Sequence, residues 1–239
     1  MLISYASVEV EYRFEVHKTA INAARSSSVS HIFYSSLAFA GNLSPTSVAS
    51  VMGTHLLTEQ YLSSLPAQGP ATYTAIREGL YSEPFPVYTA WFDIHNPVEE
   101  ITTPHSGDGP GIRWAKTDEL GEATAKMIVS YVQSSGDFLW LNKAVLLSGP
   151  QVLSLKETAD ILGRVTRKDV RIKEISAIEY AELPFKDKYW YRGVNLLNDY
   201  TLCWEAFRRR ETAVVSPLLG EILGKEPGDF ETTVRGLLH

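Results

Sequence analysis

Residues 29–37, Val-Ser-His-Ile-Phe-Tyr-Ser-Ser-Leu, form the stretch that decides the fold. Residues 32–34 at its centre are β-branched and aromatic, and the run does not alternate apolar with polar side chains. Such a run is typical of a strand that is covered on both faces, as in parallel α/β sheets. Ligands of open α/β sheets bind beyond the carboxyl ends of the strands, so Ser35, Ser36 and Leu37 are placed where chemistry is expected. Alternatively, the two serines only satisfy backbone groups at the following turn.

The composition is that of an acidic globular protein. The 239 residues are 44% hydrophobic and 21% charged, with a net charge of -6. Binding to nucleic acid needs clustered Lys and Arg, so no nucleic-acid partner is predicted. The single cysteine, Cys203, excludes an internal disulfide and a multi-cysteine zinc site, and it is typical of a reducing compartment, here the cytoplasm. No signal peptide and no apolar run of the ~20 residues that a membrane span needs is predicted.

Helical and strand patterns alternate along the chain, which favours a mostly parallel α/β sheet. The predicted helices cover residues 8–27, 47–65 and 117–133, with Thr117 as an N-cap, then a stretch from Ser154 and the tail 194–239, broken near Pro217. The predicted strands cover residues 2–5, 29–37, 72–76, 112–115, 138–147 and 170–175. Capping boxes are predicted where Ser154 precedes Glu157 and Ser176 precedes Glu179.

Residues 84–111 form the least regular segment, with five prolines and the run Gly-Asp-Gly-Pro-Gly over 107–111. This run does not have the dinucleotide-binding spacing, and Pro110 lacks an amide that a phosphate loop would use. Long irregular segments in compact domains are often functional, so we predict a lid or substrate loop.

Two histidines lie on predicted helices. On the first helix, Phe14, His17, Ile21 and Ala24 recur at helical spacing, which favours a packed core role for His17. His55 and Glu59 are four residues apart on the second helix and share one face. The carboxylate could orient the imidazole for acid–base work, or the two could be a surface pair. No second histidine stands at metal-ligand spacing, so no metal site is predicted.

Several stretches, taken together, resemble the NmrA-like family, whose members are atypical short-chain dehydrogenases/reductases. Residues 16–24, 31–37, 54–62 and 73–83 follow the order and spacing of that family, and residues 222–230 are similar to its C-terminal segment. The NADPH-dependent quinone oxidoreductases look like the most similar branch.

The resemblance implies a Rossmann-like, mostly parallel sheet with flanking helices, N-terminally truncated, and a smaller C-terminal α/β portion on the substrate side. One NAD(P)-binding-type domain would then cover residues 1–239. Its Rossmann core would comprise 1–83 and 112–147, and its substrate side 84–111 and 148–239.

The resemblance also implies site residues. Ser36, His55 and Tyr81 are the catalytic candidates, with Ser36 or His55 polarising or protonating the acceptor oxygen. The Tyr-x-x-x-Lys motif, which is the usual proton-donor arrangement of the wider short-chain dehydrogenase superfamily, is absent from this region. The cofactor NADPH would be bound by Ala6, Ser7, Ser35, Ser36, Leu37, His55, Glu78, Gly79 and Leu80.

One departure from the family pattern lies at the front of the chain. In the family a strand, a Gly-x-x-Gly-type phosphate loop, a helix and two further βα units precede the part that matches Met1. Because glycine-rich amides at a helix N-terminus hold a pyrophosphate, we expect tight NADPH binding to be lost or to use another route. We also expect the bare sheet edge at residues 2–5 to favour a homo-oligomer.

The predicted function is NAD(P)H-dependent reduction of a small apolar or aromatic carbonyl compound or quinone. A cofactor-independent isomerase or cyclase is an alternative, with His55, Glu78 and Tyr81 as acid–base groups and Tyr88, Trp91 and Tyr189 as apolar walls. A non-catalytic regulator and an inactive copy are further alternatives.

Overall fold

The computed structural model describes residues 1–239 except 6–8, 185, 192–193 and 239. The α-helices are α1 (Val10–Ser26), α2 (Gly53–Ser64), α3 (Thr117–Gln133), α4 (Leu155–Thr166), α5 (Ala177–Ala181), α6 (Leu197–Arg208), α7 (Leu218–Leu223) and α8 (Phe230–Gly236). The strands are β1 (His31–Leu37), β2 (Thr72–Glu78), β3 (Leu80–Tyr81), β4 (Glu100–Thr103), β5 (Trp114–Ala115), β6 (Lys143–Leu147), β7 (Arg171–Glu174), β8 (Trp190–Tyr191) and β9 (Val194–Asn195). The short 3-10 helices include η1 (Ser50–Met52) and η3 (Phe85–Tyr88).

The main sheet has the order β1-β2-β6, and both pairings are parallel. Its register places Ser36 opposite Arg77 and Leu37 opposite Glu78, so the carboxyl ends of the strands meet at one edge. Leu2 forms a parallel bridge to Tyr34 beside β1. The α/β fold with a mostly parallel sheet is therefore confirmed.

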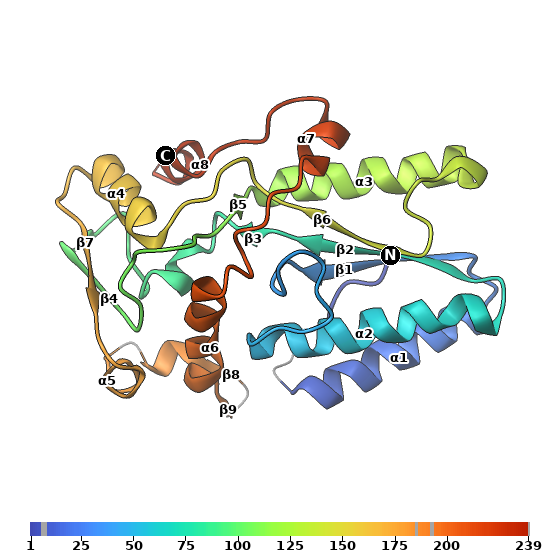
Figure 1. The fold of residues 1–239 in the computed structure, drawn as a ribbon, viewed down its shortest axis with the longest axis horizontal. Coiled ribbons are helices and arrows are strands. Elements are labelled where there is room, and N and C mark those ends of the chain that lie inside the picture. Colours follow the sequence, from blue (N-terminus) through green and yellow to red (C-terminus); the bar gives the residue numbers. More distant parts are fainter. Residues whose placement is uncertain (6–8, 185, 192–193, 239) are drawn as a thin grey trace.

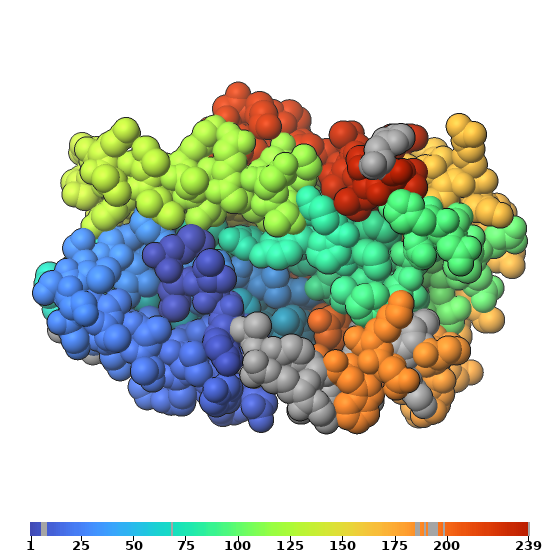
Figure 2. All heavy atoms as spheres, turned by 180° about the vertical axis from the view of Figure 1, so that it is seen from behind, coloured from blue at the N-terminus to red at the C-terminus, as the bar shows by residue number. Residues whose placement is uncertain are grey.

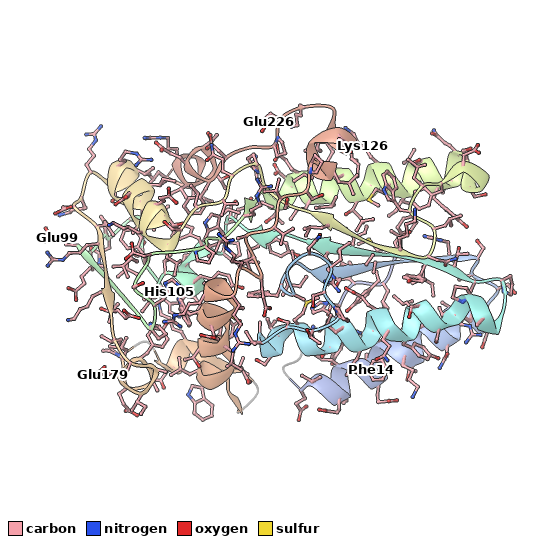
Figure 3. The ribbon with its side chains drawn as sticks, in the orientation of Figure 1. Phe14, Glu99, His105, Lys126, Glu179 and Glu226 are labelled. Atoms are coloured by element: carbon pink, nitrogen blue, oxygen red, sulfur yellow. The ribbon has the colours of Figure 1, made fainter. Side chains whose placement is uncertain are left out.

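Helices cover both faces of this sheet. α1 and α2 lie below it and α3 and α7 above it in Figure 1, and the view from behind shows α3 (yellow-green) and α1 (blue) on opposite sides (Figure 2). The Lys126 ammonium of α3 donates to the Leu223 carbonyl at 2.9 Å, which ties α3 to α7 (Figure 3).

The central strand β1 is buried on both faces, as its apolar run predicts. Phe33 packs with Met127 of α3, whereas Tyr34 packs with Ile21 of α1 on the other face. Neighbouring strand residues point to opposite faces, so one uninterrupted apolar segment can contact both helical layers.

Some predicted boundaries and caps are wrong. The second helix does not begin at residue 47, because η1 comes first and α2 begins at Gly53. Thr117 is not an N-cap: Lys116 holds that position, and the Thr117 hydroxyl instead donates to the Glu83 carboxylate at 2.6 Å. Both predicted capping boxes are present.

The predicted irregular segment 84–111 contains a strand that the sequence analysis missed. β4 pairs in parallel with β7, so its hydrogen bonds come from a strand about seventy residues further along the chain. The surrounding prolines and glycines make this strand of four residues hard to recognise in the sequence, and its hydrogen-bonding partner β7 is distant in the chain.

Candidate functional site

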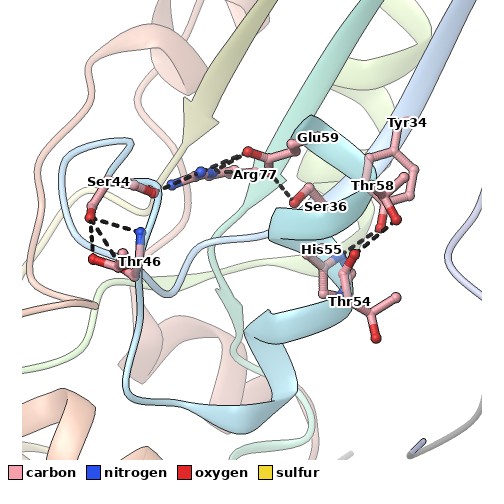
Figure 4. Close-up of polar contacts among 9 residues, drawn as sticks. All are labelled: Tyr34, Ser36, Ser44, Thr46, Thr54, His55, Thr58, Glu59 and Arg77. Atoms are coloured by element: carbon pink, nitrogen blue, oxygen red, sulfur yellow. Dashed lines mark hydrogen bonds and ion pairs between the residues drawn. The ribbon is translucent and has the colours of Figure 1, made fainter. Parts of the chain in front are cut away.

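Two buried polar clusters lie between the sheet and the helices α1 and α2. Figure 4 shows Arg77, Glu59 and Ser36 of one cluster, and Tyr34 and His55 of the other. Their positions follow from helix and strand periodicity. His55 and Glu59 are one turn apart on α2, and Tyr34 and Ser36 are two residues apart on β1. The two pairs therefore face each other, and Tyr34 bonds to His55 while Ser36 bonds to Glu59.

The Arg77 cluster consists of Arg77, Glu59, Ser36 and the Ser44 carbonyl. The guanidinium of Arg77, 2% exposed, donates from Nε and Nη2 to the Glu59 carboxylate, at 3.0 and 2.6 Å. Nη2 also donates to the Ser44 carbonyl at 3.0 Å, and the Ser36 hydroxyl donates to Glu59 at 2.6 Å. The buried positive charge is thus neutralised by a two-point ion pair.

The Arg13 cluster consists of Arg13, His55, Tyr34, Ser4 and the Tyr5 carbonyl. Arg13, 8% exposed, donates from Nε to the Tyr5 carbonyl at 3.1 Å and from Nη2 to the Ser4 hydroxyl at 2.7 Å. Its Nη2 also lies 3.4 Å from His55 Nε2. Among the described residues, no carboxylate pairs with Arg13. Within the part of the chain that the structure describes, this buried guanidinium therefore has no counterion.

His55 is held as a neutral imidazole. Burial, with Arg13 as the next cause, lowers its pKa to about 3. A guanidinium can only donate, so Nε2 accepts from Arg13 and the ring proton resides on Nδ1, 2.9 Å from the Tyr34 hydroxyl. Burial also raises the pKa of Tyr34 to about 12.

Both interpretations of the His55 and Glu59 pair are wrong. Glu59 does not orient the imidazole, because its carboxylate is taken by Arg77 and Ser36. His55 is also 6% exposed and so cannot be part of a surface pair. Side chains from β1, β2 and α1 bond to His55 and Glu59 instead, and helical spacing alone does not predict these partners.

The core role predicted for His17 is confirmed. The ring is buried, accepts from the Tyr5 amide at 2.8 Å and lies 2.9 Å from the Thr58 hydroxyl. Burial and, next, the charge of Arg13 lower its pKa to about 4.

A cavity of about 180 Å³ opens beside the Arg13 cluster, between the start of α1, η1 and α6. It is lined by Val10, Arg13, Ser50, Val51, Tyr88, Leu196, Asp199, Tyr200 and Cys203. The donors of Arg13 that bond to protein are Nε and Nη2, and no described residue bonds to Nη1. The cavity is therefore apolar for the most part, with an unpaired cation in its wall.

Cys203 is a buried thiol, as predicted. Burial raises its pKa to about 12, so it stays protonated at neutral pH. Its contribution to the cavity wall is that of a small apolar side chain.

The other predicted residues on β1 are divided between the two faces of the sheet. Ser36 lies in the Arg77 cluster, where its hydroxyl is already bonded. Ser35 points away from Ser36 and its Oγ accepts only a long 3.5 Å bond from the Ser4 amide. Leu37 is half-buried and packs against the core around Phe39 and Trp114.

The predicted residues that follow β2 lie near the opposite helical layer. The Tyr81 hydroxyl donates to the Glu78 carboxylate, and burial raises the pKa of both groups. Tyr81 packs with Phe33, whereas His55 bonds to Tyr34 on the other face, so the structure does not bring Tyr81 and His55 together.

Gly79 and Leu80 are packing positions in this structure. A Cβ on Gly79 would lie 3.0 Å from the Ala115 Cβ and 3.1 Å from the Leu147 carbonyl oxygen. Leu80 is 2% exposed. Ala6 and Ser7 lie outside the described residues.

Arg13 is the site residue that the sequence analysis missed. Helical spacing suggested Phe14 for the buried stripe of α1, but the residues buried there are Arg13, His17 and Ile21. Phe14 is half-buried, with its ring 6.2 Å from that of Tyr61. The signal was available, because Arg13 stands four residues before His17, but a charged residue is not normally assigned to a core stripe.

The predicted aromatic walls have different outcomes. Tyr88 lines the cavity, whereas the Trp91 ring has the Lys188 ammonium 5.1 Å from its centroid and is not a lining residue. The side chain of Tyr189 lies outside the described part of the chain.

Within the described ranges, no three His, Cys, Asp or Glu side chains converge to hold a metal ion. No helix in that part of the chain has the length and apolar character for crossing a membrane.

Comparison with known proteins identifies a relative over almost the whole chain. An NmrA-like family domain-containing oxidoreductase, flvB of Aspergillus flavus, is 29% identical over 231 residues, which are 97% of this chain and 69% of that protein. The resemblance to the NmrA-like family is confirmed. No protein-family model matches this chain.

Solved structures share the fold. The NADPH-dependent quinone oxidoreductase QOR2 from Escherichia coli, complexed with NADPH, has a TM-score of 0.77 and 24% identity, covering 100% of this chain and 75% of that chain. Triphenylmethane reductase from Citrobacter sp. has a TM-score of 0.75 and 22% identity, covering 99% and 75%. NmrA, a negative transcriptional regulator in complex with NAD, has a TM-score of 0.62 and 15% identity, covering 93% and 69%.

Proposed function

We propose that this NmrA-like chain is an NAD(P)H-dependent oxidoreductase that reduces a quinone or another carbonyl compound. The oxidoreductase name of the Aspergillus flavus relative and the NADPH in the QOR2 complex support this proposal. The observation that carries it is the unpaired, buried guanidinium of Arg13 in the wall of an apolar cavity.

Ser35, at the carboxyl end of β1, would contact the nicotinamide half of the cofactor. Ser35 is half-buried there, and no described residue accepts a hydrogen bond from its hydroxyl. Ser35 would therefore donate to the ribose. Ser36 and Gly79 do not take part in this proposal, because Ser36 is committed to Glu59 and Gly79 is closely packed.

The cofactor, when bound, supplies the hydride. Arg13 would donate a hydrogen bond from Nη1 to the acceptor oxygen and would stabilise the negative charge that develops there. The guanidinium keeps its own proton, so solvent water would supply the proton that completes the alcohol or hydroquinone when the product leaves. The guanidinium is positioned before the reaction by the Ser4 hydroxyl, the Tyr5 carbonyl and the neutral His55. Apolar walls keep water away, so the attraction between this cation and the developing oxyanion is stronger than in bulk water. His55 then acts through Arg13 as a positioning residue.

The test begins with calorimetric titration of the purified chain with NADPH. Saturable binding is expected, followed by consumption of NADPH in the presence of 2-methyl-1,4-naphthoquinone. A folded chain that binds no NADPH would rule out the cofactor-dependent function for this chain. Binding without hydride transfer to any quinone or carbonyl compound would favour the regulator instead.

A further inference from the structure

The lining of the cavity carries two charges of opposite sign. Arg13 comes from the start of α1, and Asp199 from the first turn of α6. No described residue pairs with the Asp199 carboxylate, just as none pairs with Arg13. We propose that this cavity selects an apolar compound with an acceptor oxygen at one end, for Arg13, and a protonated amine at the other, for Asp199.

The position of Asp199 on α6 supports its part in the site. Asp199 and Cys203 are four residues apart, so they share one face of the helix, and both line the cavity. The Ser50 hydroxyl donates to the Asp199 carbonyl at 3.4 Å, which fixes this turn of α6 against η1. Cys203 is buried at the base of this face, whereas Asp199 is exposed and lies at the rim.

Size and polarity restrict the ligand further. A cavity of about 180 Å³ accommodates a single aromatic ring with short substituents, since benzene fits engineered cavities of about 150 Å³. The remaining walls, Val10, Val51 and Leu196, favour an apolar ring between the two polar ends. The part of the inference that concerns Arg13 rests on the proposed function, and the part that concerns Asp199 is independent of it.

The experiment compares two probes of the same shape. In 4′-(aminomethyl)acetophenone and 4′-ethylacetophenone, an ammonium group replaces a methyl group and the acetyl oxygen is common to both. Binding is measured by the change in protein fluorescence, without cofactor, at low ionic strength. We expect the amine to bind roughly 3- to 10-fold more tightly, as for a partly exposed charge-assisted hydrogen bond. Asp199→Asn should remove this preference and Asp199→Glu should retain it.

A matched control is available on α4. Asp160→Asn removes a carboxylate that lines a different hollow, between α4 and the start of α8, and should leave the amine preference unchanged. If Asp199 only interacted favourably with the N-terminus of its own helix, Asp199→Asn would change the stability of the protein. It would not change the ratio of the two probe affinities.

Each outcome separates the inference from the proposed function. Equal affinity for the two probes, or an amine preference that survives Asp199→Asn, overturns the inference even if NADPH oxidation occurs. An amine preference that depends on Asp199 supports the inference, and it does so even if no NADPH is consumed, in which case only the oxidoreductase proposal fails.

Discussion

The two buried arginines of this protein have opposite electrostatic environments. Arg77 is 2% exposed and its charge is neutralised by Glu59 at 2.6 Å. Arg13 is 8% exposed and bonds only to neutral groups of the described chain. His55 and Glu59, which lie one turn apart on α2, are the partners that distinguish the two clusters.

The difference indicates that the two arginine clusters have different roles. A buried cation with a carboxylate partner is electrostatically complete and joins β2 to α2. A buried cation with no partner loses solvation without a compensating ion pair, so it attracts negative charge that arrives from outside. The Arg77 cluster is thus structural, and the Arg13 cluster is suited to an oxyanion.

The largest effect is expected from breaking the paired cluster. Glu59→Gln leaves Arg77 buried without a counterion and should lower the free energy of unfolding by about 3–5 kcal/mol, measured by urea denaturation. The control is Glu122→Gln, which breaks the exposed pair with Lys126 and should leave the free energy of unfolding nearly unchanged. An equally small loss in Glu59→Gln would mean that this fold tolerates an unpaired guanidinium, and the contrast with Arg13 would disappear.

The next effect concerns the unpaired cluster. Arg13→Met should lower kcat/KM for quinone reduction about 10²- to 10³-fold, because it removes a donor aimed at the developing oxyanion. The free energy of unfolding should change by about 1–2 kcal/mol, from the hydrogen bonds that are lost. Arg13→Lys keeps the charge and should recover part of the rate. A rate that Arg13→Met leaves intact would refute the role of Arg13.

The pH dependence of stability reports on the histidines next to Arg13. The pKa values of His17 and His55 are lowered from 6.5 to about 4 and about 3, so both rings are neutral in the folded state and take up protons on unfolding. Their stabilisation is complete above pH 6.5 and is lost as the pH falls toward the folded values, by about 1.4 kcal/mol per pH unit for each ring.

Urea denaturation at pH 7, 6 and 5 measures this slope. His55→Gln should flatten it, whereas His95→Gln, at an exposed position, should not change it. A slope that His55→Gln leaves unchanged would contradict the buried, neutral state of this imidazole.

The smallest effect assigns Ser36 to one of the two clusters. Ser36→Ala removes a hydrogen bond to the Glu59 carboxylate and should lower the free energy of unfolding by about 1.5 kcal/mol. The rate of quinone reduction should stay within about two-fold of the unmodified protein, because the Ser36 hydroxyl is bonded to Glu59 in the Arg77 cluster and has no part in the proposed reaction. A large loss of rate with unchanged stability would restore the catalytic role predicted for Ser36.

The sequence by itself determined the features whose causes are local. The apolar run 29–37 predicts a strand that is buried on both faces, and β1 is buried in this way. The boxes at Ser154 and Ser176 need only residues three positions apart, and both are formed. The core roles of His17 and Cys203 also followed from their apolar neighbours along the chain.

Tertiary structure alone decided which partners the polar residues take. Spacing placed His55 and Glu59 on one face of α2, but Arg13 and Arg77 reach them from 42 and 18 residues away in the chain. The strand β4 likewise depends on β7, and the cavity is assembled from α1, η1 and α6. Local propensity and periodicity are encoded within a few residues, whereas the pairing of buried charges depends on which distant segments the packed core brings within hydrogen-bond distance.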